Sequence, residues 1–424
     1  MTSTLRTKRV AVVGQGYVGL PLALSAVSAG YVVFGVERAT ERLRSLEAAR
    51  SYVDDVSNAE IESALQSGQY QVLSDVSDLR GIDVVVITVP TPLGADGKPD
   101  LRFVLSSVTG LDGVLSPNAV VILESTTFPG TTQDIVGPIL EQSAGRRIGS
   151  SVHLGFSPER IDPGNRVFNM ATTPKLVSGV TPECLNKVRA FYQSLGINTV
   201  DVAGTREAEF AKLLENTFRL VNIALVNELA EYGHKRGIDT REAIRAASTK
   251  PFGFMPFQPG PGIGGHCIPI DPNYLSWEAE ASVGMQLDIV NTAVRVNGKR
   301  PDYIAHAVVD RLAADGVQNS ALVVVIGLAY KSNVVDIRES PALRVIEVLR
   351  AYGIDVLVYD PVVGDSTIGD VHVRSSLTAE ELDRCTLGVL LTDHDDNDYA
   401  AFADLDIPII DTRNRLTGRS IVAV

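Results

Sequence analysis

Short apolar runs alternate with segments of helical periodicity over roughly the first half of the chain. Apolar runs at Arg9–Val13, Val32–Val36, Val84–Val89 and Val120–Leu123 are rich in β-branched residues, and Leu20–Ala29 has apolar side chains at helical spacing. Strands that alternate with helices are typical of a parallel sheet covered by helices on both faces. The pattern therefore predicts an α/β domain at the N-terminal end, which we expect to end near residue 205.

The middle of the chain follows a different pattern. Arg206–Arg236 keeps helical periodicity and contains no proline and no glycine before Gly233, which predicts one long helix. Helical segments continue to about residue 300 and are interrupted by the Pro- and Gly-rich stretch Pro256–Gly265. A helix of this length needs packing partners for its apolar face. We expect a mainly helical domain over residues 206–300.

The C-terminal segment repeats the opening pattern. After Arg300–Pro301 a helical segment leads into the strand-like run Leu322–Gly327, a helix from about Pro341 and a second strand-like run at Asp355–Asp360. The order strand, helix, strand is that of the chain's first unit. Residues 301–424 are therefore predicted to form a second α/β domain, related to the first as a degenerate internal repeat.

A glycine pattern marks the first strand-to-helix turn. Gly14, Gly16 and Gly19 have the spacing G-x-G-x-x-G, and Glu37 follows eighteen positions past Gly19 at the end of the second strand. Glycine permits the tight turn and the close approach of a pyrophosphate to the helix N-terminus, and the carboxylate binds ribose hydroxyls. The alternative is a tight turn without a ligand. Glu37 would repel a 2′-phosphate and favours NAD, although the neighbouring Arg38 leaves NADP open.

The predicted fold class is therefore α/β. It consists of two Rossmann-like domains joined by a central helical domain with one long helix. The second α/β domain lacks the three-glycine pattern. The predicted divisions are 1–205, 206–300 and 301–424. NAD is the predicted cofactor of the first domain.

Charge and composition exclude several classes of protein. With 38 basic against 51 acidic residues, the net charge of −13 argues against a general nucleic-acid binder or an acidic-membrane binder. The longest apolar run, Ala321–Ala329, is too short to cross a bilayer, and the N-terminus has no signal-peptide pattern. The 3 cysteines are widely separated, which argues against a disulfide framework and a zinc site. We expect a cytoplasmic protein without a metal.

Cys267 is the candidate nucleophile. A cysteine is in general more often a small buried hydrophobe, but Gly264 and Gly265 precede this one and Asp271 follows four positions later. The glycines would let a ligand approach the backbone, and the carboxylate could hold a water or a catalytic neighbour. His266 is adjacent, but consecutive side chains point apart, so it is given no role.

Two further pairs of polar residues are candidate site residues, and each pair also has an ordinary structural explanation. Lys212 and Asn216 lie one turn apart on the predicted long helix, within a largely apolar segment, where a solvated stripe is the alternative. Glu159 and Arg160 lie in a turn-rich loop, where the alternative is a surface ion pair. The residues alone leave both questions open.

Seven motifs in order resemble the nucleotide-sugar 6-dehydrogenases, the UDP-glucose and UDP-N-acetylhexosamine dehydrogenase family. They are Gly14–Ala23, Val89–Leu93, Glu124–Thr132, Ser157–Arg160, Lys212–Asn216, Gly264–Cys267 with Asp271, and Gly327–Lys331 with Arg338–Pro341. The resemblance implies an N-terminal NAD domain, a central helical domain that forms a homodimer, and a C-terminal domain that binds the UDP group.

The resemblance also implies the reaction and the residues that perform it. The C6 hydroxymethyl group of a UDP-sugar is oxidised by NAD to a carboxylate, through a thiohemiacetal and a thioester on Cys267. Lys212 and Asn216 stabilise the oxyanion. Asp271 orients or activates a water with Thr127 nearby, and Glu159 is the acid or base of thioester hydrolysis. No metal is required.

The remaining site residues follow from the same resemblance. NAD contacts are implied for Gly14, Gly16, Tyr17, Val18, Gly19, Glu37, Arg38, Pro90, Thr91, Thr126 and Arg338. Substrate contacts are implied for Glu159, Arg160, Lys212, Asn216, Phe257, Gly264, Lys331 and Arg413. The basic residues among them supply the positive charge that the acidic chain otherwise lacks.

The sugar is predicted from the cysteine loop. Ile270 stands before Asp271, where the UDP-glucose branch usually has a lysine, so the loop favours UDP-N-acetylglucosamine, with Arg160 a candidate neighbour of the acetamido group. UDP-N-acetylmannosamine, UDP-N-acetylgalactosamine and UDP-glucose are the alternatives. Two other functions are alternatives. One is a single-hydride dehydrogenase of the β-hydroxyacid type, which would not need Cys267. The other is an enzymatically silent nucleotide-binding module, which would need no nucleophile.

Overall fold

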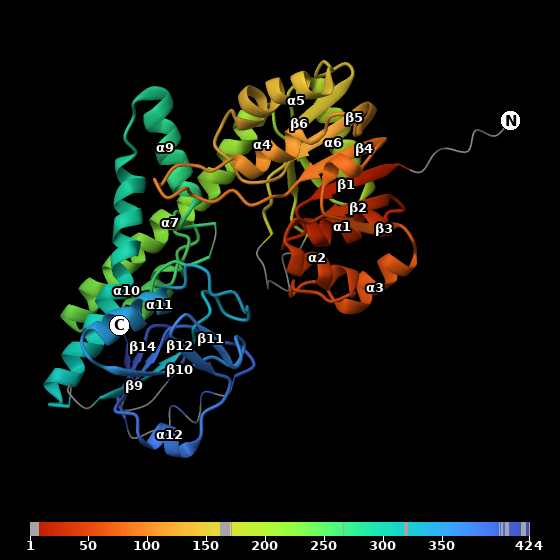
Figure 1. Cartoon of the computed structure of the whole chain (residues 1–424). Coiled ribbons are helices and arrows are strands. Elements are labelled where there is room, and N and C mark those ends of the chain that lie inside the picture. The colour runs from red at the N-terminus through yellow and green to blue at the C-terminus, as the bar shows by residue number, and fades with distance from the viewer. Residues whose placement is uncertain are drawn as a thin grey trace. The chain divides into compact units, whose positions relative to one another are not determined.

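The computed structural model describes residues 8–161, 170, 172–265, 267–317, 321–397, 399, 402, 407–416 and 421–423. These form two compact units, the first comprising Met1–Glu215 with Glu280–Val283 and the second Asn216–Ala279 with Gly284–Val424. Each unit contains one large sheet, and both sheets are mostly parallel (Figure 1). The predicted α/β class with two Rossmann-like sheets and a helical middle region is confirmed.

The first unit is built on an eight-stranded sheet in the order β3-β2-β1-β4-β5-β6-β7-β8. Its strands are β1 (Arg9–Val13), β2 (Val32–Val36), β3 (Tyr70–Leu73), β4 (Ile82–Ile87), β5 (Leu115–Leu123), β6 (Val152–Phe156), β7 (Lys175–Gly179) and β8 (Thr199–Asp201). All pairings are parallel except β6 with β7. The reversal of strand order beside β1 creates the edge at which Rossmann sheets bind dinucleotides.

Helices cover both faces of this sheet. They are α1 (Gly19–Ser28), α2 (Thr40–Glu47), α3 (Asn58–Gln66), α4 (Arg102–Thr109), α5 (Gly137–Ala144) and α6 (Pro182–Ser194). Alternate strand residues face opposite ways, so Val10 and Val12 pack with α1, α2, α3 and α6, whereas Ala11 and Val13 pack with α4 and α5. The two cores explain the continuous apolar runs of the strands, because both faces are buried.

Four helices connect the two sheets along the chain. They are α7 (Thr205–Arg236), α8 (Thr240–Ala247), α9 (Asp271–Val283) and α10 (Asp288–Ala314). The long helix predicted from Arg206 is α7, which begins in the first unit and ends in the second.

Helix α10 differs from the sequence pattern, which divided the chain at Arg300–Pro301. The helix continues through Pro301, and the proline itself is buried. The buried face of α10 packs against α11 (Pro341–Ala351), and this packing outweighs the backbone hydrogen bond that the proline cannot donate.

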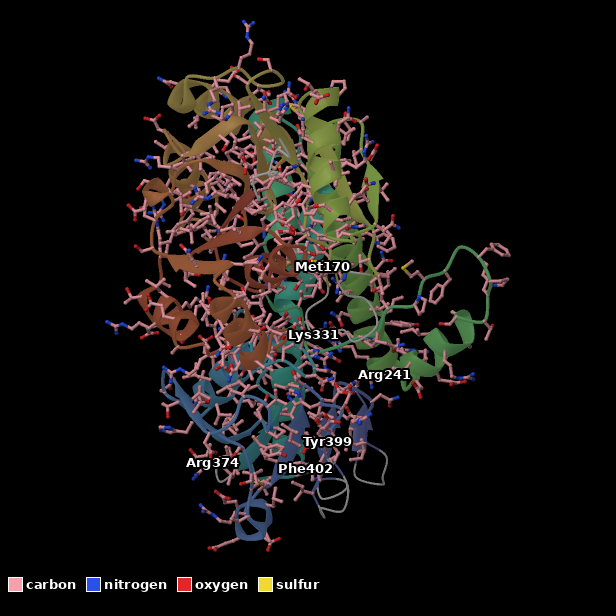
Figure 2. The ribbon with its side chains drawn as sticks, turned by 90° about the vertical axis from the view of Figure 1, so that its right-hand side faces the viewer. Met170, Arg241, Lys331, Arg374, Tyr399 and Phe402 are labelled. Carbon is pink, nitrogen blue, oxygen red and sulfur yellow. The ribbon has the colours of Figure 1, made fainter. Side chains whose placement is uncertain are left out.

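The second unit is built on a seven-stranded sheet in the order β11-β12-β10-β9-β13-β14-β15. Its strands are β9 (Leu322–Ile326), β10 (Asp355–Tyr359), β11 (Ser366–Ile368), β12 (Val371–Arg374), β13 (Leu387–Leu390), β14 (Ile409–Asp411) and β15 (Ile421–Ala423), and α12 (Ala379–Asp383) lies beside them. One face packs on α10 and α11, while aromatic residues line the other. Tyr359, Tyr399 and Phe402 form that aromatic cluster, and Figure 2 labels the last two.

Candidate active site

The glycine loop after β1 has the shape that a dinucleotide site requires. Gly14 has a φ of 97°, and a Cβ atom there would lie 2.7 Å from the carbonyl oxygen of Thr88. A Cβ atom on Gly19 would lie 1.9 Å from the carbonyl oxygen of Gly14. A Cβ atom on Gly16, in contrast, would meet nothing closer than Arg42 Nη1 at 3.9 Å. Two glycines are thus needed by the fold, and the third leaves open the space where a pyrophosphate fits.

The same loop leads directly into α1. Val18 is the residue before this helix, and its carbonyl oxygen accepts the amide of Leu22 at 3.3 Å. Tyr17 packs against the core on the α1 side of the sheet. The amides of this turn therefore lie at a helix N-terminus, which favours an anionic ligand.

Glu37 follows β2 and turns back to the glycine loop. One carboxylate oxygen accepts the amide of Gln15 at 3.3 Å, and the other accepts the amide of Ala39 at 2.9 Å. Arg38 is directed elsewhere, because its guanidinium contacts Asp75 at 3.3 Å and Ser106 at 3.0 Å. The acidic side chain thus faces the loop while the basic neighbour is ion-paired, an arrangement that fits NAD.

The loops after β4 and β5 supply the next polar groups. Pro90 and Thr91 follow β4, and Thr91 Oγ1 donates to the carbonyl oxygen of Thr126 at 2.8 Å. Thr127 is completely buried, and its hydroxyl oxygen has no hydrogen-bond partner among the described residues. A buried hydroxyl without a partner indicates a group that a ligand satisfies. The residues present here therefore fit NAD.

Glu159 lies in the loop after β6 and is firmly held. One carboxylate oxygen accepts the amides of Arg160 at 2.7 Å and Ile161 at 2.6 Å, and the other lies 3.3 Å from Lys175 Nζ. Burial opposes ionisation of this carboxyl, but Lys175 and the amides outweigh it and lower the pKa of Glu159 below its ordinary value. Glu159 is therefore ionised, as a general base must be.

Arg160 forms an ion pair instead of facing open solvent. Its guanidinium contacts Glu215 on α7 at 2.8 Å and the carbonyl oxygen of Pro174 at 2.8 Å. Glu159 and Arg160 are therefore not paired with one another, but Arg160 forms a partly exposed ion pair with Glu215, so the ordinary alternative stays open for Arg160.

Helix α7 carries three polar residues into buried surroundings. Glu209 accepts the amides of Gly130 at 2.6 Å and Thr132 at 2.8 Å, and so ties α7 to the segment that follows Thr127. Lys212 is buried, and its ammonium group forms no hydrogen bond or ion pair with the described part of the chain. A solvated stripe is excluded for Lys212, and a buried cation of this kind attracts an anionic ligand.

Asn216 connects α7 to the turn that carries Cys267. Its Nδ2 donates to Asp271 Oδ2 at 2.5 Å, and both residues are buried. The amide of Asp271, the first residue of α9, donates to the carbonyl oxygen of Cys267 at 2.8 Å. Cys267 thus lies half-buried in the turn that leads into α9. His266 lies outside the described residues.

The space beside the two glycines before Cys267 is filled by other parts of the protein. A Cβ atom on Gly264 would lie 2.7 Å from the carbonyl oxygen of Glu339, and one on Gly265 would lie 2.8 Å from the ring of Tyr330. The loop following β9 and the segment before α11 therefore fill the space on the Cβ side of both glycines, and the expectation that a ligand approaches their backbone stays a prediction. The glycines fix the course of the cysteine loop.

Other parts of the Pro- and Gly-rich loop are anchored to helices. Gly260 accepts Arg300 Nε of α10 at 2.9 Å, and its amide donates to Asn227 Oδ1 of α7 at 2.9 Å. Phe257 stacks edge-on against Phe218 of α7, with ring centroids 5.8 Å apart. The loop is thus a fixed part of the second unit, and Phe257 presents an aromatic ring beside it.

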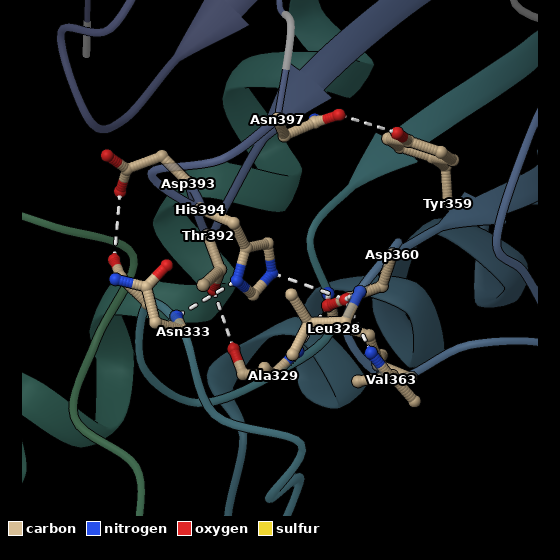
Figure 3. A network of polar contacts seen from close by, with 12 residues as sticks. Leu328, Ala329, Asn333, Tyr359, Asp360, Val363, Thr392, Asp393, His394 and Asn397 are labelled. Atoms are coloured by element: carbon tan, nitrogen blue, oxygen red, sulfur yellow. Dashed lines mark hydrogen bonds and ion pairs between the residues drawn. The ribbon is translucent and has the colours of Figure 1, made fainter. Parts of the chain in front are cut away.

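The loop after β9 carries Lys331 and is held by a buried acid. Asp360, directly after β10, accepts the amides of Leu328 at 2.7 Å and Ala329 at 2.9 Å, and its other oxygen lies 3.2 Å from His394 Nε2 (Figure 3). His394 Nδ1 accepts the amide of Asn333 at 3.0 Å. Lys331 therefore lies between two fixed points of the loop, half-buried and labelled in Figure 2.

Asp360 is charged over a wide pH range. Burial alone would raise its pKa, but the nearby His394 ring and hydrogen bonds from the amides of Val363 and Ala329 outweigh burial and lower the pKa of Asp360 to about 2. Arg338, in the segment before α11, forms a bidentate pair with Asp336 at 2.6 to 3.0 Å. The implied contact of Arg338 with NAD stays a prediction.

Arg413 lies beside a cavity of about 350 Å³ at the end of β14. Its Nε donates to the carbonyl oxygen of Leu391 at 2.7 Å, and burial lowers the pKa of its guanidinium. The cavity is lined by Asp239, Arg241, Glu242, Arg245, Gln258, Arg413 and Asn414. Three guanidinium groups around one cavity favour an anion such as a phosphate.

Sequence reasoning missed the buried partners of these residues. Lys175 and Glu209 were given no role, and Glu124 was noted only as part of a motif. The available signal was weak: Lys175 stands at the start of an apolar strand and Glu209 precedes Lys212 by three positions on one helix face. Among the described residues no cluster of His, Cys, Asp and Glu side chains is placed to hold a metal, and none of the described helices has the length and apolarity of a membrane span.

Comparisons with known proteins agree with this geometry. Three models of the UDP-glucose/GDP-mannose dehydrogenase family match the chain: the NAD binding domain over residues 8–196, the central domain over 206–299 and the UDP binding domain over 324–418. Together they match well over half of the chain. The divisions at residues 205 and 300 stay predictions.

Individual relatives are similar over most of their length. The chain is 38% identical to protein CapL of Staphylococcus aureus over 83% of this chain and 82% of the relative. It is 36% identical to the UDP-N-acetyl-D-glucosamine 6-dehydrogenase of Pseudomonas aeruginosa over 84% and 83%. The solved structure of a UDP-D-ManNAc dehydrogenase from Pyrococcus horikoshii matches with a TM-score of 0.87 and 31% identity over 98% of both chains.

These matches exclude the enzymatically silent module and the single-hydride β-hydroxyacid enzyme as descriptions of this chain. The family's first domain binds NAD, in agreement with the open space at Gly16 and the buried hydroxyl of Thr127. The chain belongs to the UDP-glucose/GDP-mannose dehydrogenase family and is an NAD-dependent UDP-sugar dehydrogenase.

Proposed function

We propose that this enzyme oxidises the C6 hydroxymethyl group of a UDP-N-acetylhexosamine to a carboxylate in two successive oxidations, the second of them on an active-site cysteine. The observation that carries the proposal is the hydrogen bond from Asn216 to Asp271, which joins α7 to the turn of Cys267. A dehydrogenase that stops at the aldehyde has no use for a cysteine held in this way. The bound NAD accepts a hydride in each oxidation, and two NAD are consumed per sugar.

The cysteine holds the aldehyde between the two oxidations. The Cys267 sulfur adds to the C6 carbonyl carbon and forms a thiohemiacetal, whose oxidation gives a thioester. The half-buried position of Cys267 in the turn that leads into α9 supports this role. Covalent capture prevents escape and hydration of the aldehyde.

Lys212 and Asn216 stabilise negative charge on the C6 oxygen. Lys212 is a buried cation without a partner in the described chain, and Asn216 offers an amide donor one helical turn further along α7. A fixed positive charge in a low-dielectric site stabilises an oxyanion more strongly than in water. Asp271 fixes the amide of Asn216 and orients a water.

Glu159 is the base that activates water for thioester hydrolysis. Its carboxylate is anchored by two amides and held ionised, so it can accept a proton from an attacking water. The unpartnered hydroxyl of Thr127 is available to a ligand or to that water. Hydrolysis frees the Cys267 thiol and releases the carboxylate product.

The UDP group binds to the second unit in this proposal. Lys331 offers a cation on the loop fixed by Asp360, Arg413 offers a guanidinium beside its cavity, and Phe257 offers an aromatic ring. Gly264 contributes backbone in a loop of fixed shape. Arg338 is proposed to contact NAD, and Arg160 to lie near the acetamido group.

UDP-N-acetylglucosamine is the proposed sugar, with UDP-N-acetylmannosamine, UDP-N-acetylgalactosamine and UDP-glucose as alternatives. Ile270 in the cysteine loop supports an N-acetylhexosamine. The relatives named above include enzymes for both the gluco and the manno epimer. They support an N-acetylhexosamine as the substrate and favour neither epimer.

The test is the stoichiometry of the reaction with a panel of these four UDP-sugars. Two NADH per sugar and a product about 14 Da heavier establish the four-electron oxidation, and the highest kcat/KM identifies the sugar. A Cys267→Ala variant is expected to abolish acid formation while NAD binding persists. One NADH per sugar with a product about 2 Da lighter, or unchanged acid formation by Cys267→Ala, contradicts the proposal.

We also propose that the enzyme is a homodimer that pairs through α7. Phe218, Leu225, Leu229 and Tyr232 are exposed and recur at spacings of three, four and seven, so they form one apolar stripe on this helix. A Leu225→Glu and Leu229→Glu double variant is expected to halve the mass measured by light scattering. An unchanged mass contradicts pairing through this stripe, and a matched Lys235→Glu variant, outside the stripe, is the control.

A further inference from the structure

Three buried side chains surround the partly buried Glu159, the proposed base of thioester hydrolysis. Lys175 begins β7, Glu124 follows β5, Glu159 follows β6 and Tyr192 lies on α6. The side chains of Lys175 and Glu124 are only 7% and 1% exposed. Charged groups are this deeply buried only when they are paired, so the contacts within the cluster decide its charge.

Lys175 is the centre of the cluster. Its ammonium group donates to Glu124, lies 3.3 Å from Glu159 Oε2 and 3.4 Å from the carbonyl oxygen of Pro158, and stands 5.1 Å above the ring of Tyr192. Tyr192 in turn donates its hydroxyl to Glu124 Oε2 at 2.8 Å. Every donor of the ammonium group thus faces a fixed acceptor.

Glu159 is held from two directions as a result. The amides of Arg160 and Ile161 hold one of its oxygens, and Lys175 holds the other. A carboxylate with both oxygens engaged cannot rotate away from the loop after β6. Without Lys175 the carboxylate would lose the one cation that faces it among the described residues.

The cluster contains one cation for two carboxyl groups. When both carboxyl groups are ionised, the buried site carries one net negative charge, which the low-dielectric interior disfavours. Burial raises the pKa of Glu124 to about 7, although Lys175 lowers it, whereas the pKa of Glu159 lies below its ordinary value. Glu124 is only 1% exposed, whereas Glu159 is 16% exposed and is anchored by two backbone amides, so near neutral pH the proton of the pair resides on Glu124 and leaves Glu159 ionised.

We infer that Lys175 and Glu124 are positioning residues of the dehydrogenase: Lys175 holds Glu159 in place as a carboxylate, and Glu124 carries the proton that neutralises the cluster. The inference rests on the proposed role of Glu159 in thioester hydrolysis. It gives two residues that act through Glu159 a measurable part in the second half of the reaction.

The groups that face Glu159 are known from each neighbouring element. Lys175 faces it from β7, Glu124 from the end of β5 and Tyr192 from α6. Arg160 is adjacent in sequence but is paired with Glu215 at 2.8 Å. Among the described residues, Lys175 is thus the unshared cation that faces Glu159.

The experiment compares Lys175→Met, Lys175→Arg and Glu124→Gln with the wild type, using intact mass spectrometry of the sugar thioester on Cys267 and the pH profile of kcat. In Lys175→Met we expect kcat at pH 7 to fall about 100-fold, the thioester to accumulate, and the acidic limb of the profile to move up by about one pH unit or more. Lys175→Arg keeps the charge and is expected to restore most of kcat. Glu124→Gln is expected to lose the ionisation near pH 7.

The control is Lys187→Met, which removes an exposed lysine paired with Glu183 on α6 and is expected to leave both measurements unchanged. A Glu159→Gln variant separates the two hypotheses. If Glu159→Gln hydrolyses the thioester normally, the role of Glu159 itself is wrong. If Glu159→Gln accumulates thioester while Lys175→Met keeps the wild-type profile, the inference about Lys175 alone is overturned.

Thermal melting of each variant shows which of them fold. If Lys175→Met does not fold, the Glu124→Gln variant still tests the inference. It keeps the positive charge of Lys175 in the cluster and removes only the carboxyl group that is assigned the proton. A Glu124→Gln profile that keeps the ionisation near pH 7 contradicts the assignment of the proton to Glu124.

Discussion

The two sheets use the same strand, turn and helix design for different purposes. Gly14 after β1 and Gly327 after β9 both have positive φ, of 97° and 90°, and each donates its amide at 2.8 Å to the last residue of the neighbouring strand, Val36 or Tyr359. A threonine from the next strand of the sheet closes each turn, Thr88 in the first unit and Thr392 in the second. The turns after β1 and β9 are thus built in the same way in the two units.

The difference lies in the acid that follows the second strand. Glu37 accepts two amides and lies 3.9 Å from Arg42 Nη1, whereas Asp360 accepts four amides and lies 3.2 Å from His394. Asp360 is fully inaccessible to solvent, whereas Glu37 retains 8% exposure. The same position therefore remains open to a ribose in one sheet and is saturated by the protein in the other. In the second sheet the acid serves the loop that carries Lys331.

The largest effects are expected where a glycine is required by the backbone. Gly14→Ala and Gly327→Ala each place a methyl group within 3 Å of a carbonyl oxygen at positive φ, so both are expected to cost about 3 kcal/mol or more in stability. Gly16→Ala meets no atom within 3.8 Å and is expected to fold normally but to raise KM for NAD at least about tenfold. Denaturant melts and NAD titrations measure both. A destabilised Gly16→Ala contradicts the distinction.

Replacement of each acid by its amide separates a role in stability from a role in NAD binding. Asp360→Asn removes a charge that four amides and His394 stabilise, and is expected to lower the free energy of unfolding by about 2 to 3 kcal/mol. Glu37→Gln is expected to cost less than about 1 kcal/mol and to act mainly on KM for NAD. Equal stability losses in the two variants would remove the contrast between an open and a saturated site.

The pH dependence of stability sharpens the same contrast. The folded-state pKa of Asp360 is about 2, below its unfolded value, so the stabilisation of about 2 kcal/mol is present above pH 4 and is lost as the pH falls toward 2. The stability difference between wild type and Asp360→Asn should therefore shrink over this window, measured by urea melts at each pH. A difference that stays constant from pH 5 to pH 2.5 would show that the charge of Asp360 is not its source.

The smallest effect is expected in the choice between NAD and NADP. Glu37→Ala removes the charge that repels a 2′-phosphate, while Arg38 remains paired with Asp75. We expect the ratio of kcat/KM for NADP to that for NAD to rise about tenfold. Adding Asp75→Ala frees Arg38 and should raise the ratio further. A double variant no better than the single one would show that Arg38 does not reach the 2′-phosphate.

The sequence predicts the parts of the fold that local periodicity encodes. Strands β1 and β2 have the predicted bounds, and α7 differs by one residue at its start. The bounds of β4 are shifted, because Thr88 leaves the strand to close the turn at Gly14. The sequence pattern divided the chain at Arg300–Pro301, but α10 continues through Pro301, because this helix packs against α11, which lies far along the chain and is invisible to local periodicity.

The candidate site divides in the same way. Glycines and the Cys267 turn were visible because short motifs have fixed spacing. Lys175, Glu124 and Glu209 were not, since each acquires its meaning only from a partner 16 to 79 positions away. The glycine loop at Gly264 was found, but the residues that fill its space come from the segment before α11.

The course of the cysteine loop has a consequence for protein synthesis. Gly265 donates its amide to the carbonyl oxygen of Arg338 and lies against Tyr330, so the loop of Cys267 is shaped by a segment that the ribosome makes more than sixty residues later. The nascent thiol therefore exists before its reactive setting does. An emerging chain is expected to react with thiol reagents like an ordinary cysteine, and only the completed second unit gives Cys267 its geometry.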